Sequence, residues 1–591
     1  MKRVEDAALV MALAAMALVP IVELLMRSAF HSGIFGAASI VQHLGLAVAM
    51  IGGAVAARED RLLTISALKV FLEGRTQRVA AFVANGIAAA ICAMLFVAGV
   101  EFVMAERPAA TTLAYGVPTW WVQALIPAGF ALIGWRLLAR IALGAPARTA
   151  ALVAAALVIG LTQLLPSISG SALGVTLAVL IVGAIAGTPL FAVLAGAALL
   201  LFWHQGLPLA SIAVDHYRTV VNPTLPAIPL FTIAGYLLAE GGAPRRFVEV
   251  FDALFGRVRG GPAIATVVAC TFFTSFTGAS GATVLALGGL VLPLLLSNGY
   301  SERSALGLAT AAGLPGTLLM PALPLILYAI VARVDIRDMF LGGLLPSLLM
   351  VAIVAAWGVS QRPRQPIDAK PFDWGRVRNA LADAKWELGV PLVAVASLGS
   401  GYATPVESAA LTAIYVFIVT VFVRRDLTLR RDAPRVIAEC GLIVGGILLV
   451  MGVALGLTDL LVDAQVPERL VAWASDTAGS KTVFLLALNL FLLLAGCLIE
   501  IYPAIIVLAP LVTQLGPAFD VHPVHLGIIF LANMELGYLT PLVGLNLFFA
   551  SYRFGKPIGV IFRAVLPLFF ALAVGVLLIT YIPWLSLAFL P

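Results

Sequence analysis

Two stretches of the sequence decide the fold class. Residues 277–296 read TGASGATVLALGGLVLPLLL, and residues 313–331 read GLPGTLLMPALPLILYAIV. In both stretches, glycine, proline and small polar residues interrupt a run of apolar residues. Each interruption frees backbone N–H and C=O groups, which are tolerated at membrane depth only when they are buried in protein or line a wet cavity. The first stretch predicts a helix that starts at a tight turn, and the second predicts a helix that is broken inside a membrane.

Both stretches have counterparts later in the sequence. Residues 500–512 read EIYPAIIVLAPLV and residues 535–551 read ELGYLTPLVGLNLFFAS, while FLGGLLPSLL at 340–349 matches IFRAVLPLFF at 561–570. The prolines keep similar spacings, 28 and 25 residues in the first set and 31 and 26 in the second. Apolar segments resemble one another through composition alone, but three matching broken elements favour an internal repeat. Paired segments that glycine and proline interrupt point to the midplane binding site of a transporter.

The composition identifies a polytopic membrane protein. Of the 591 residues, 62% are hydrophobic and only 11% are charged, against about 25% charged residues in soluble domains. Long gaps without Asp, Glu, Lys or Arg, such as the one between Arg148 and Asp215, hold more than one membrane span. Because a span needs about 20 apolar residues, we expect an all-α protein with about 14–16 membrane segments, some of them too short to cross alone.

The first 148 residues contain four expected spans, at about residues 7–27, 34–57, 79–104 and 119–140. Lys and Arg collect in cytoplasmic loops. Ten basic residues fall on the side of the N-terminus, and only Arg27 and Arg107 fall on the opposite side. We therefore expect a cytoplasmic N-terminus. The net charge of +6 is explained by these loops, so no nucleic-acid partner is expected.

The pattern of interruptions divides the chain near residue 170. Residues 1–148 form an expected four-helix domain with few breaks, 149–172 form an expected connecting helix, and 173–591 carry the interrupted segments. Two related halves are predicted within this last part, at about 261–359 and 436–591. Four spans return the chain to the side of the membrane on which it starts. One extra crossing would therefore start the second domain on the opposite side, as the fusion of two separate membrane proteins requires.

The turn at 277–283 is the first candidate binding site. Thr277, Ser280 and Thr283 offer hydroxyls, Gly278 allows close approach, and the flanking half-helices end in free N–H and C=O groups. Such groups suit a hard cation bound through oxygen, or an anion bound through N–H groups. The alternative is that these small residues serve ordinary contacts between helices.

The two helix breaks are the matching candidates. Gly313 and Gly316 flank one proline, and Gly537 and Thr540 precede another. A proline removes one helical hydrogen bond and exposes a carbonyl about one turn earlier. A structural kink explains either break alone, whereas their occurrence at equivalent places in both halves favours ion coordination.

Three carboxylates lie within long apolar stretches, where an ionised group is costly and usually has a partner. Glu407 fits the first turn of a helix, where we expect it to act as a cap. Glu500 immediately precedes the second turn, where it either helps to neutralise a cation or orients the turn. Glu535 is open between a functional and a structural role, and Asn546 either supports the second site or caps a backbone group.

Neither an enzyme nor an ATP-driven pump is favoured by the remaining motifs. The cysteines are scattered without a CxxC pair, and His522 and His525 have no further His or Cys nearby to complete a metal site. A phosphate-binding loop and a nucleotide fingerprint are both absent from the sequence. We expect no cofactor, and a driving force that comes from an ion gradient, the membrane potential or the substrate gradient. A polytopic membrane enzyme is the remote alternative.

With these motifs assembled, the chain resembles the tripartite ATP-independent periplasmic (TRAP) transporters, as a fusion of their small and large membrane subunits. The resemblance is weak over 1–148 and strong from about 174 onward. It is carried by TGASGAT (277–283), PALPLILY (321–328), YATPVESAA (402–410) and GYLTPLVGLNLF (537–548).

The resemblance implies sodium-coupled uptake of a small organic acid, a carboxylate, across the bacterial inner membrane. A separate periplasmic binding protein would deliver this substrate. The implied mechanism is an elevator, in which the small-subunit part and outer helices form a scaffold while two hairpins and two broken helices carry the substrate. A carboxylate or anion carrier that needs no binding protein is the alternative, because it shares the hairpin architecture.

The resemblance also assigns ion-binding residues by position. Those of the first hairpin tip and the opposing break are Thr277, Gly278, Ser280, Thr283, Gly313 and Gly316. Those of the second tip and break are Glu500, Gly537, Thr540 and Gly544. Glu500 takes the place of the usual Asp.

Several residues depart from the family pattern. Met320, Pro321 and Ala322 stand where a double proline and a serine are usual. Leu542 replaces the second proline of the other break, and Tyr502 stands where a threonine is usual. These departures concern the ion ligands and leave the expected fold unchanged.

Overall fold

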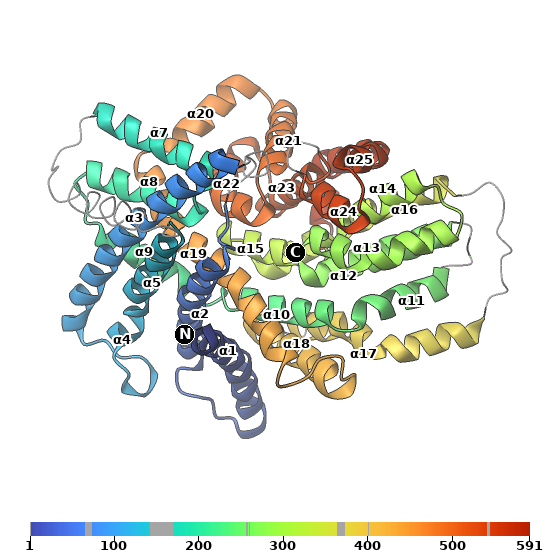
Figure 1. Cartoon of the computed structure of the whole chain (residues 1–591), viewed down its shortest axis with the longest axis horizontal. Helices are drawn as coiled ribbons and strands as arrows, with labels where there is room; N and C mark the ends of the chain where they lie inside the picture. Colours follow the sequence, from blue (N-terminus) through green and yellow to red (C-terminus); the bar gives the residue numbers. More distant parts are fainter. Residues whose placement is uncertain are drawn as a thin grey trace. The chain divides into compact units, whose positions relative to one another are not determined.

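The computed structural model describes residues 2–64, 74–141, 170–255, 258, 260–362, 373–399, 401–540 and 544–590. This part of the chain is helical, with two isolated β-bridges and no longer strand (Figure 1). Most of the expected connecting helix at 149–172 lies outside the described residues.

Apolar helices of membrane-spanning length dominate the described residues. Eleven helices are long and apolar enough to cross a membrane, and there are twelve such spans if one bent pair counts as a single span. Five further apolar helices are shorter, among them Gly261–Thr277 and Pro523–Gly537. These findings confirm the predicted all-α polytopic membrane fold, including segments too short to cross alone.

The contacts within the chain define two compact units. Unit 1 comprises Met1–Pro229 and Ile437–Arg469, and unit 2 comprises Leu230–Val436 and Leu470–Pro591. The helices that begin in unit 1 before residue 229 are α1 (Lys2–Phe30), α2 (Ala37–Glu59), α3 (Gly74–Glu106), η1 (Arg107–Ala109), η2 (Ala114–Gly116), α4 (Thr119–Gln123), α5 (Leu125–Ile141), α7 (Gly170–Ala186), α8 (Leu190–His204), α9 (Ala210–Val220) and the first residues of α10 (Ala227–Glu240). Most of α19 (Asp432–Asp463) and the start of α20 (Val466–Ala478) complete the unit.

Glycines hold α19 against the N-terminal helices of unit 1. A Cβ atom on Gly445 would lie 2.5 Å from the Cα atom of Gly52 in α2, and one on Gly441 would lie 2.7 Å from the Cγ atom of Leu9 in α1. Small residues let helix backbones approach this closely in membranes. A segment that is more than 370 residues away in sequence therefore becomes part of the N-terminal helical unit.

Unit 2 carries the interrupted segments. Its helices in the first half are α10, α11 (Ala243–Phe255), α12 (Gly261–Thr277), α13 (Ser280–Ser297), α14 (Glu302–Ala311), η3 (Leu314–Leu318), α15 (Leu323–Val331), α16 (Ile336–Ser360), α17 (Trp374–Gly399), α18 (Pro405–Ile418) and η4 (Val419–Val423). Those in the second half are α20, α21 (Lys481–Leu498), α22 (Ile501–Leu515), η5 (Pro517–Phe519), α23 (Pro523–Gly537), α24 (Leu545–Phe554), α25 (Ile558–Tyr581) and α26 (Trp584–Leu587).

Each half of unit 2 contains one helical hairpin and one broken helix. In the first half, α12 and α13 pack together across a two-residue turn, and the helical stretch from α14 to η3 bends by 42° before α15. In the second half, α21 and α22 meet at an extended Ile499, and α23 stops at Gly537 before α24 starts at Leu545. The predicted pair of hairpins and pair of broken helices is present.

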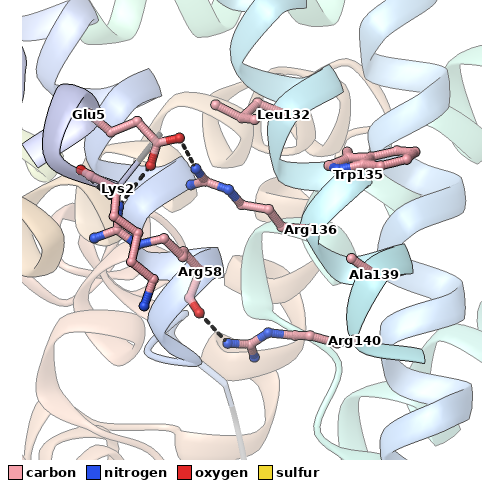
Figure 2. A pocket seen from close by; sticks show the side chains of 8 residues that line it. All are labelled: Lys2, Glu5, Arg58, Leu132, Trp135, Arg136, Ala139 and Arg140. Atoms are coloured by element: carbon pink, nitrogen blue, oxygen red, sulfur yellow. Dashed lines mark hydrogen bonds and ion pairs between the residues drawn. The ribbon is translucent and has the colours of Figure 1, made fainter. Parts of the chain in front are cut away.

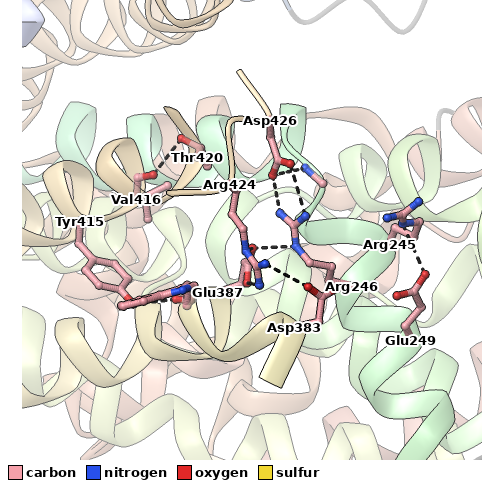
Figure 3. A network of polar contacts seen from close by, with 12 residues as sticks. Arg245, Arg246, Glu249, Asp383, Glu387, Tyr415, Val416, Thr420, Arg424 and Asp426 are labelled. Carbon is pink, nitrogen blue, oxygen red and sulfur yellow. Dashed lines mark hydrogen bonds and ion pairs between the residues drawn. The ribbon is translucent and has the colours of Figure 1, made fainter. Parts of the chain in front are cut away.

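A buried ion-pair network ties α11 to α17 and to the segment after α18 (Figure 3). The Glu387 carboxylate is fully buried, lies 2.7 Å from Nε of Arg246, and accepts a hydrogen bond from Nε of Arg424 at 3.1 Å. On its other side the Arg246 guanidinium pairs with Asp426, which also accepts the N–H of Gly242 at 2.9 Å. Removing one partner of such a network leaves a buried charge uncompensated, at a cost of about 3–5 kcal/mol.

The network sets the ionisation of Asp426. Burial opposes the charged form, but the hydrogen bonds from Arg246 and Gly242, together with the charges of Arg246 and Arg424, outweigh it and lower the pKa of Asp426 below its ordinary value. A carboxyl group with a lowered pKa in the folded state contributes stability above its unfolded pKa of about 3.9. This contribution is lost as the pH falls through the folded pKa.

We predict that Asp426→Asn lowers the thermal unfolding midpoint of the protein in detergent at pH 7, and that the difference from wild type shrinks as the pH falls below about 4. Unfolding curves between pH 7 and the acid limit of solubility measure this. Exposed Asp476 provides the matched control, since Asp476→Asn removes a carboxyl group outside the network. If the unfolding midpoints of Asp426→Asn and wild type differ by the same amount at both ends of the pH range, the prediction is contradicted.

Candidate functional site

The tip of the first hairpin is built on a left-handed glycine. Gly278 has φ of +68° and donates its N–H to the carbonyl of Thr274 at 2.8 Å, which closes the end of α12. Ala279 is then extended, and Ser280 begins α13. A Cβ atom at Gly278 would lie 2.8 Å from the Cβ atom of Leu323 in α15. Glycine is therefore required here by both its backbone conformation and its closeness to the first broken helix.

The first hairpin packs directly on the first helix break. The hydroxyls of Thr274 and Thr283 share a hydrogen bond at 2.6 Å. A Cβ atom at Gly313 would lie 2.7 Å from Oγ1 of Thr274 and 3.3 Å from Cβ of Thr283, while one at Gly316 would lie 2.6 Å from Cβ of Thr274. The structure thus brings Thr283, Gly313 and Gly316 together, as their place in the sequence suggests. Thr277 also lies at the tip, with its hydroxyl 3.4 Å from the Phe273 carbonyl.

The second hairpin packs on the second helix break. The N–H of Ile501, the first residue of α22, donates to the hydroxyl of Tyr538, and Gly537 lies in backbone contact with Gly496 of α21. Thr540 donates its hydroxyl to the carbonyl of Gly537 at 2.7 Å. In turn, the carbonyl of Thr540 accepts the N–H of Gly544 at 2.9 Å.

Glu500 lies at the start of α22, where it is half-buried. It occupies the N-cap position but forms no side-chain capping hydrogen bond. Glu500 directly precedes Ile501, whose N–H donates to the hydroxyl of Tyr538. The structure therefore places Glu500 beside the second tip without assigning it a protein partner there.

Three hydrogen bonds at the hairpin tips link the two halves of unit 2. Ser280 of the first hairpin donates its hydroxyl to Oε2 of Glu535 at 2.8 Å, and accepts from Nδ2 of Asn546 at 3.1 Å. Tyr502 of the second hairpin donates its hydroxyl to the carbonyl of Gly278 at 2.9 Å. The two hairpin tips and the second broken helix therefore meet in one cluster. Tyr502, which departs from the usual threonine, still provides a hydroxyl, but directs it to the opposite tip.

Glu535 is the most unusual member of this cluster. Its side chain is 2% exposed, while Ser280 and Asn546 are fully buried. Oε1 of Glu535 has no hydrogen-bond partner, so one carboxylate oxygen is left uncompensated. A buried carboxylate oxygen without a hydrogen-bond donor attracts either a hard cation or a proton.

Sequence reasoning did not single out Thr274 and Tyr538, and it noted Tyr502, Glu535 and Asn546 without assigning them as ion ligands. Intramembrane position identified Glu535 as a candidate, but its partner Ser280 lies 255 residues away in sequence. Tyrosine and asparagine in apolar segments carry no charge that would distinguish them from other buried polar residues. Only the packing of the two halves brings these five side chains to the tips.

Other candidates have structural roles. Glu407 forms the predicted helix cap, because its carboxylate accepts the N–H of Thr404 at 2.7 Å and the Thr404 hydroxyl accepts the N–H of Glu407 at 3.2 Å. His522 caps α23 through Nδ1, and His525 contacts the carbonyl of Thr580. Across the described ranges, no three His, Cys, Asp or Glu residues are grouped to hold a metal ion.

The fold and the cluster define a class of protein: a polytopic membrane transporter whose two hairpins face two broken helices. The chain belongs to the TRAP transporters. Residues 173–585 match the family described as "Tripartite ATP-independent periplasmic transporter, DctM component". Residues 16–147 match "Tripartite ATP-independent periplasmic transporters, DctQ component". The chain is thus a fusion of the small and large membrane subunits, as predicted, and it is a transporter and not an enzyme.

Two relatives support the assignment. The chain is 34% identical to the C4-dicarboxylate TRAP transporter large permease protein DctM of Pseudomonas aeruginosa, over 64% of this chain and 88% of the relative. It is 32% identical to the isethionate TRAP transporter permease protein DctMQ of Oleidesulfovibrio alaskensis, over 65% of this chain and 60% of the relative. A solved structure, the Alcanivorax borkumensis YdaH transporter, superposes with a TM-score of 0.47 at 16% identity, covering 64% of this chain and 88% of that one.

We predict that Ser280 and Glu535 are energetically coupled. In a double-mutant cycle with Ser280→Ala and Glu535→Met, the free energies of unfolding in detergent should deviate from additivity by about 0.5–3 kcal/mol. The reason is that either change alone leaves a buried polar group without its partner. Ser275→Ala is the matched control, since Ser275 lies on the same hairpin but donates to the carbonyl of Phe272. If the effects of Ser280→Ala and Glu535→Met on the free energy of unfolding are additive, the hydrogen bond between Ser280 and Glu535 is contradicted.

Proposed function

We propose that this chain is the membrane component of a sodium-coupled transporter for a small organic acid, a carboxylate, which a periplasmic binding protein delivers. The observation that carries the proposal is the buried cluster in which Ser280, Glu535 and Asn546 join the first hairpin to the second broken helix. Transporters bind substrate and coupling ions at such helix interruptions near the middle of the membrane.

The chemistry of the tips supports a cation as the coupling species. Sodium is a hard cation that prefers oxygen ligands, and the tips contribute hydroxyls, backbone carbonyls and the free Oε1 of Glu535. Glu500 adds a second carboxylate beside the other tip. The candidate ion ligands are those named from the sequence, to which we add Glu535.

Membership of the family and the names of relatives support the substrate class. C4-dicarboxylates and isethionate, which the relatives' names give, are both small organic anions. The same membership supports a periplasmic binding protein as the partner that presents the substrate. An inner membrane location follows for a multi-pass permease of this family. A cytoplasmic N-terminus is part of the proposal, on the basis of the basic residues around the first four spans.

An elevator movement is the mechanism that we propose for transport. In its support, unit 2 contains both hairpins and both broken helices, whereas the described helices of unit 1 contain neither. Unit 1 includes the region that matches the small subunit, which suits a scaffold. We also propose that residues 1–148 and 173–591 correspond to the two ancestral subunits, joined through 149–172.

We predict that uptake of a radiolabelled C4-dicarboxylate into proteoliposomes requires both an inward sodium gradient and the binding protein. Ser280→Ala and Glu535→Gln should each weaken the apparent sodium affinity by about tenfold, which corresponds to ~1.4 kcal/mol for one lost ligand. Ser275→Ala is again the control on the same hairpin. The measurement is initial uptake rate against sodium concentration at fixed binding protein and substrate.

Three outcomes would contradict parts of this proposal. Uptake that is the same with and without sodium excludes sodium coupling, whatever the substrate. Uptake by the purified chain without binding protein instead favours an independent carboxylate carrier. An unchanged sodium dependence in both variants, together with the normal dependence in Ser275→Ala, removes the Ser280–Glu535 cluster from the ion site.

A further inference from the structure

A second feature lies in unit 1, where the start of α1 and the ends of α2 and α5 come together around a pocket of about 320 Å³ (Figure 2). Five charged side chains line it: Lys2, Glu5, Arg58, Arg136 and Arg140. Four of these are basic and one is acidic, so the wall of the pocket carries a formal charge of +3 (4 − 1). This is the side of the membrane that the basic residues mark as cytoplasmic.

Two of the arginines are held in fixed positions. Arg58 donates to Glu5 at 2.8 Å, and Arg136 donates both to Glu5 and to the carbonyl of Ala54. The side chains of Arg58, Arg136 and Glu5 are only 11–14% exposed. Glu5 therefore bridges the two guanidinium groups, and Asp6 and Glu59 also pair with Arg58, so that acidic side chains hold this part of the wall in place.

The other two cations are more available. Lys2 is 75% exposed, and its ammonium group lies 3.8 Å from Glu59, beyond hydrogen-bond distance. Arg140 pairs with the exposed Asp60, but its own side chain is only 26% exposed and also donates to the carbonyl of Arg58 at 2.8 Å. Exposed ion pairs contribute little stability, so Lys2 can exchange its partner at small cost, and Arg140 can exchange Asp60 while it keeps its bond to the Arg58 carbonyl. With Asp6, Glu59 and Asp60 included, the cluster is neutral, and any attraction for an anion acts at short range within the pocket.

The remaining wall of the pocket is apolar. Leu132, Trp135 and Ala139 line it from one face of α5, next to the arginines at 136 and 140 (Figure 2). Trp135 is 66% exposed although it belongs to a membrane span. Tryptophan prefers the level of the lipid headgroups, where its ring contacts both acyl chains and polar groups. The pocket thus combines a cationic end with an apolar strip.

We propose that this pocket binds an anionic phospholipid of the cytoplasmic leaflet. The phosphate would lie between Lys2 and Arg140 at the cationic end, and an acyl chain would lie along Trp135 and Leu132. Arginine and lysine at the ends of membrane helices recognise lipid phosphates in this way. A free phosphate would satisfy the cations but leave the apolar strip uncovered, which is why a lipid fits better. The proposal does not depend on the transported substrate.

Quenching of tryptophan fluorescence by brominated lipid tests this proposal in the full chain. The protein is reconstituted in phosphatidylcholine bilayers that contain increasing fractions of either brominated phosphatidylglycerol or brominated phosphatidylcholine. The difference between wild type and Trp135→Phe isolates the signal of Trp135 among the nine tryptophans. We expect half-maximal quenching of Trp135 at a fraction of the anionic lipid at least about fivefold lower than that of the zwitterionic lipid.

The variant Lys2→Gln/Arg140→Gln should lose this preference, and both positions can be changed without touching the Glu5–Arg58–Arg136 contacts. Its matched control is Arg3→Gln/Arg61→Gln, which removes the same charge from exposed positions outside the pocket. Equal quenching by the two lipids in wild type overturns the proposal, as does a preference that both double variants retain. Loss of the preference on adding inorganic phosphate identifies a free-anion site and overturns the lipid assignment.

Discussion

Hydrocarbon offers no hydrogen-bonding partner, so each interrupted helix of this protein must satisfy its freed backbone and side-chain groups within the protein. The first hairpin tip meets this constraint through Gly278, whose N–H closes α12 and whose carbonyl accepts the Tyr502 hydroxyl. Ser280 meets it by bonding to Glu535 and Asn546. Because these partners come from the opposite half of unit 2, neither half is complete without the other.

This mutual dependence explains why the elements are arranged in pairs. A hairpin alone exposes its tip, and a broken helix alone exposes its break, but each covers the other when they pack. Gly313 and Gly316 allow the contact in one half, and Gly496 and Gly537 allow it in the other. The cost is a carboxylate, Glu535, with one oxygen unpaired in an apolar setting. Such an uncompensated group marks a functional site more often than a structural one.

Charged residues are few in this chain, and their two main clusters, one in each unit, have distinct roles. In unit 2, Glu387 is fully buried between Arg246 and Arg424, and the network fixes α11 and α17 together. In unit 1, Arg58 and Arg136 are held by Glu5 at the ends of α1, α2 and α5, whereas the neighbouring Lys2 is 75% exposed and lies 3.8 Å from its nearest carboxylate. The same ion-pair chemistry is therefore fixed where the side chains are buried and adaptable at the exposed Lys2.

Much of the fold was predictable from local patterns in the sequence. Apolar runs and charge gaps predict the membrane helices because span length is set by the bilayer, and glycine and proline predict the turns and breaks because they alter the backbone directly. The capping role of Glu407 was predictable for the same reason, since its partner Thr404 is three residues away. The residues of both tips could also be named, because their small side chains and hydroxyls stand within the interruptions.

What local patterns cannot supply is the identity of partners that lie far away in sequence. The sequence by itself determined that the chain is a helical membrane protein with two repeated sets of broken elements, because backbone breaks and hydrophobicity act over a few residues. Only the tertiary structure decided that Ser280 bonds to Glu535, that Tyr502 reaches the opposite tip, and that residues 437–463 pack with the N-terminal helices. Those contacts arise from close packing between segments hundreds of residues apart, which no pattern along the chain encodes.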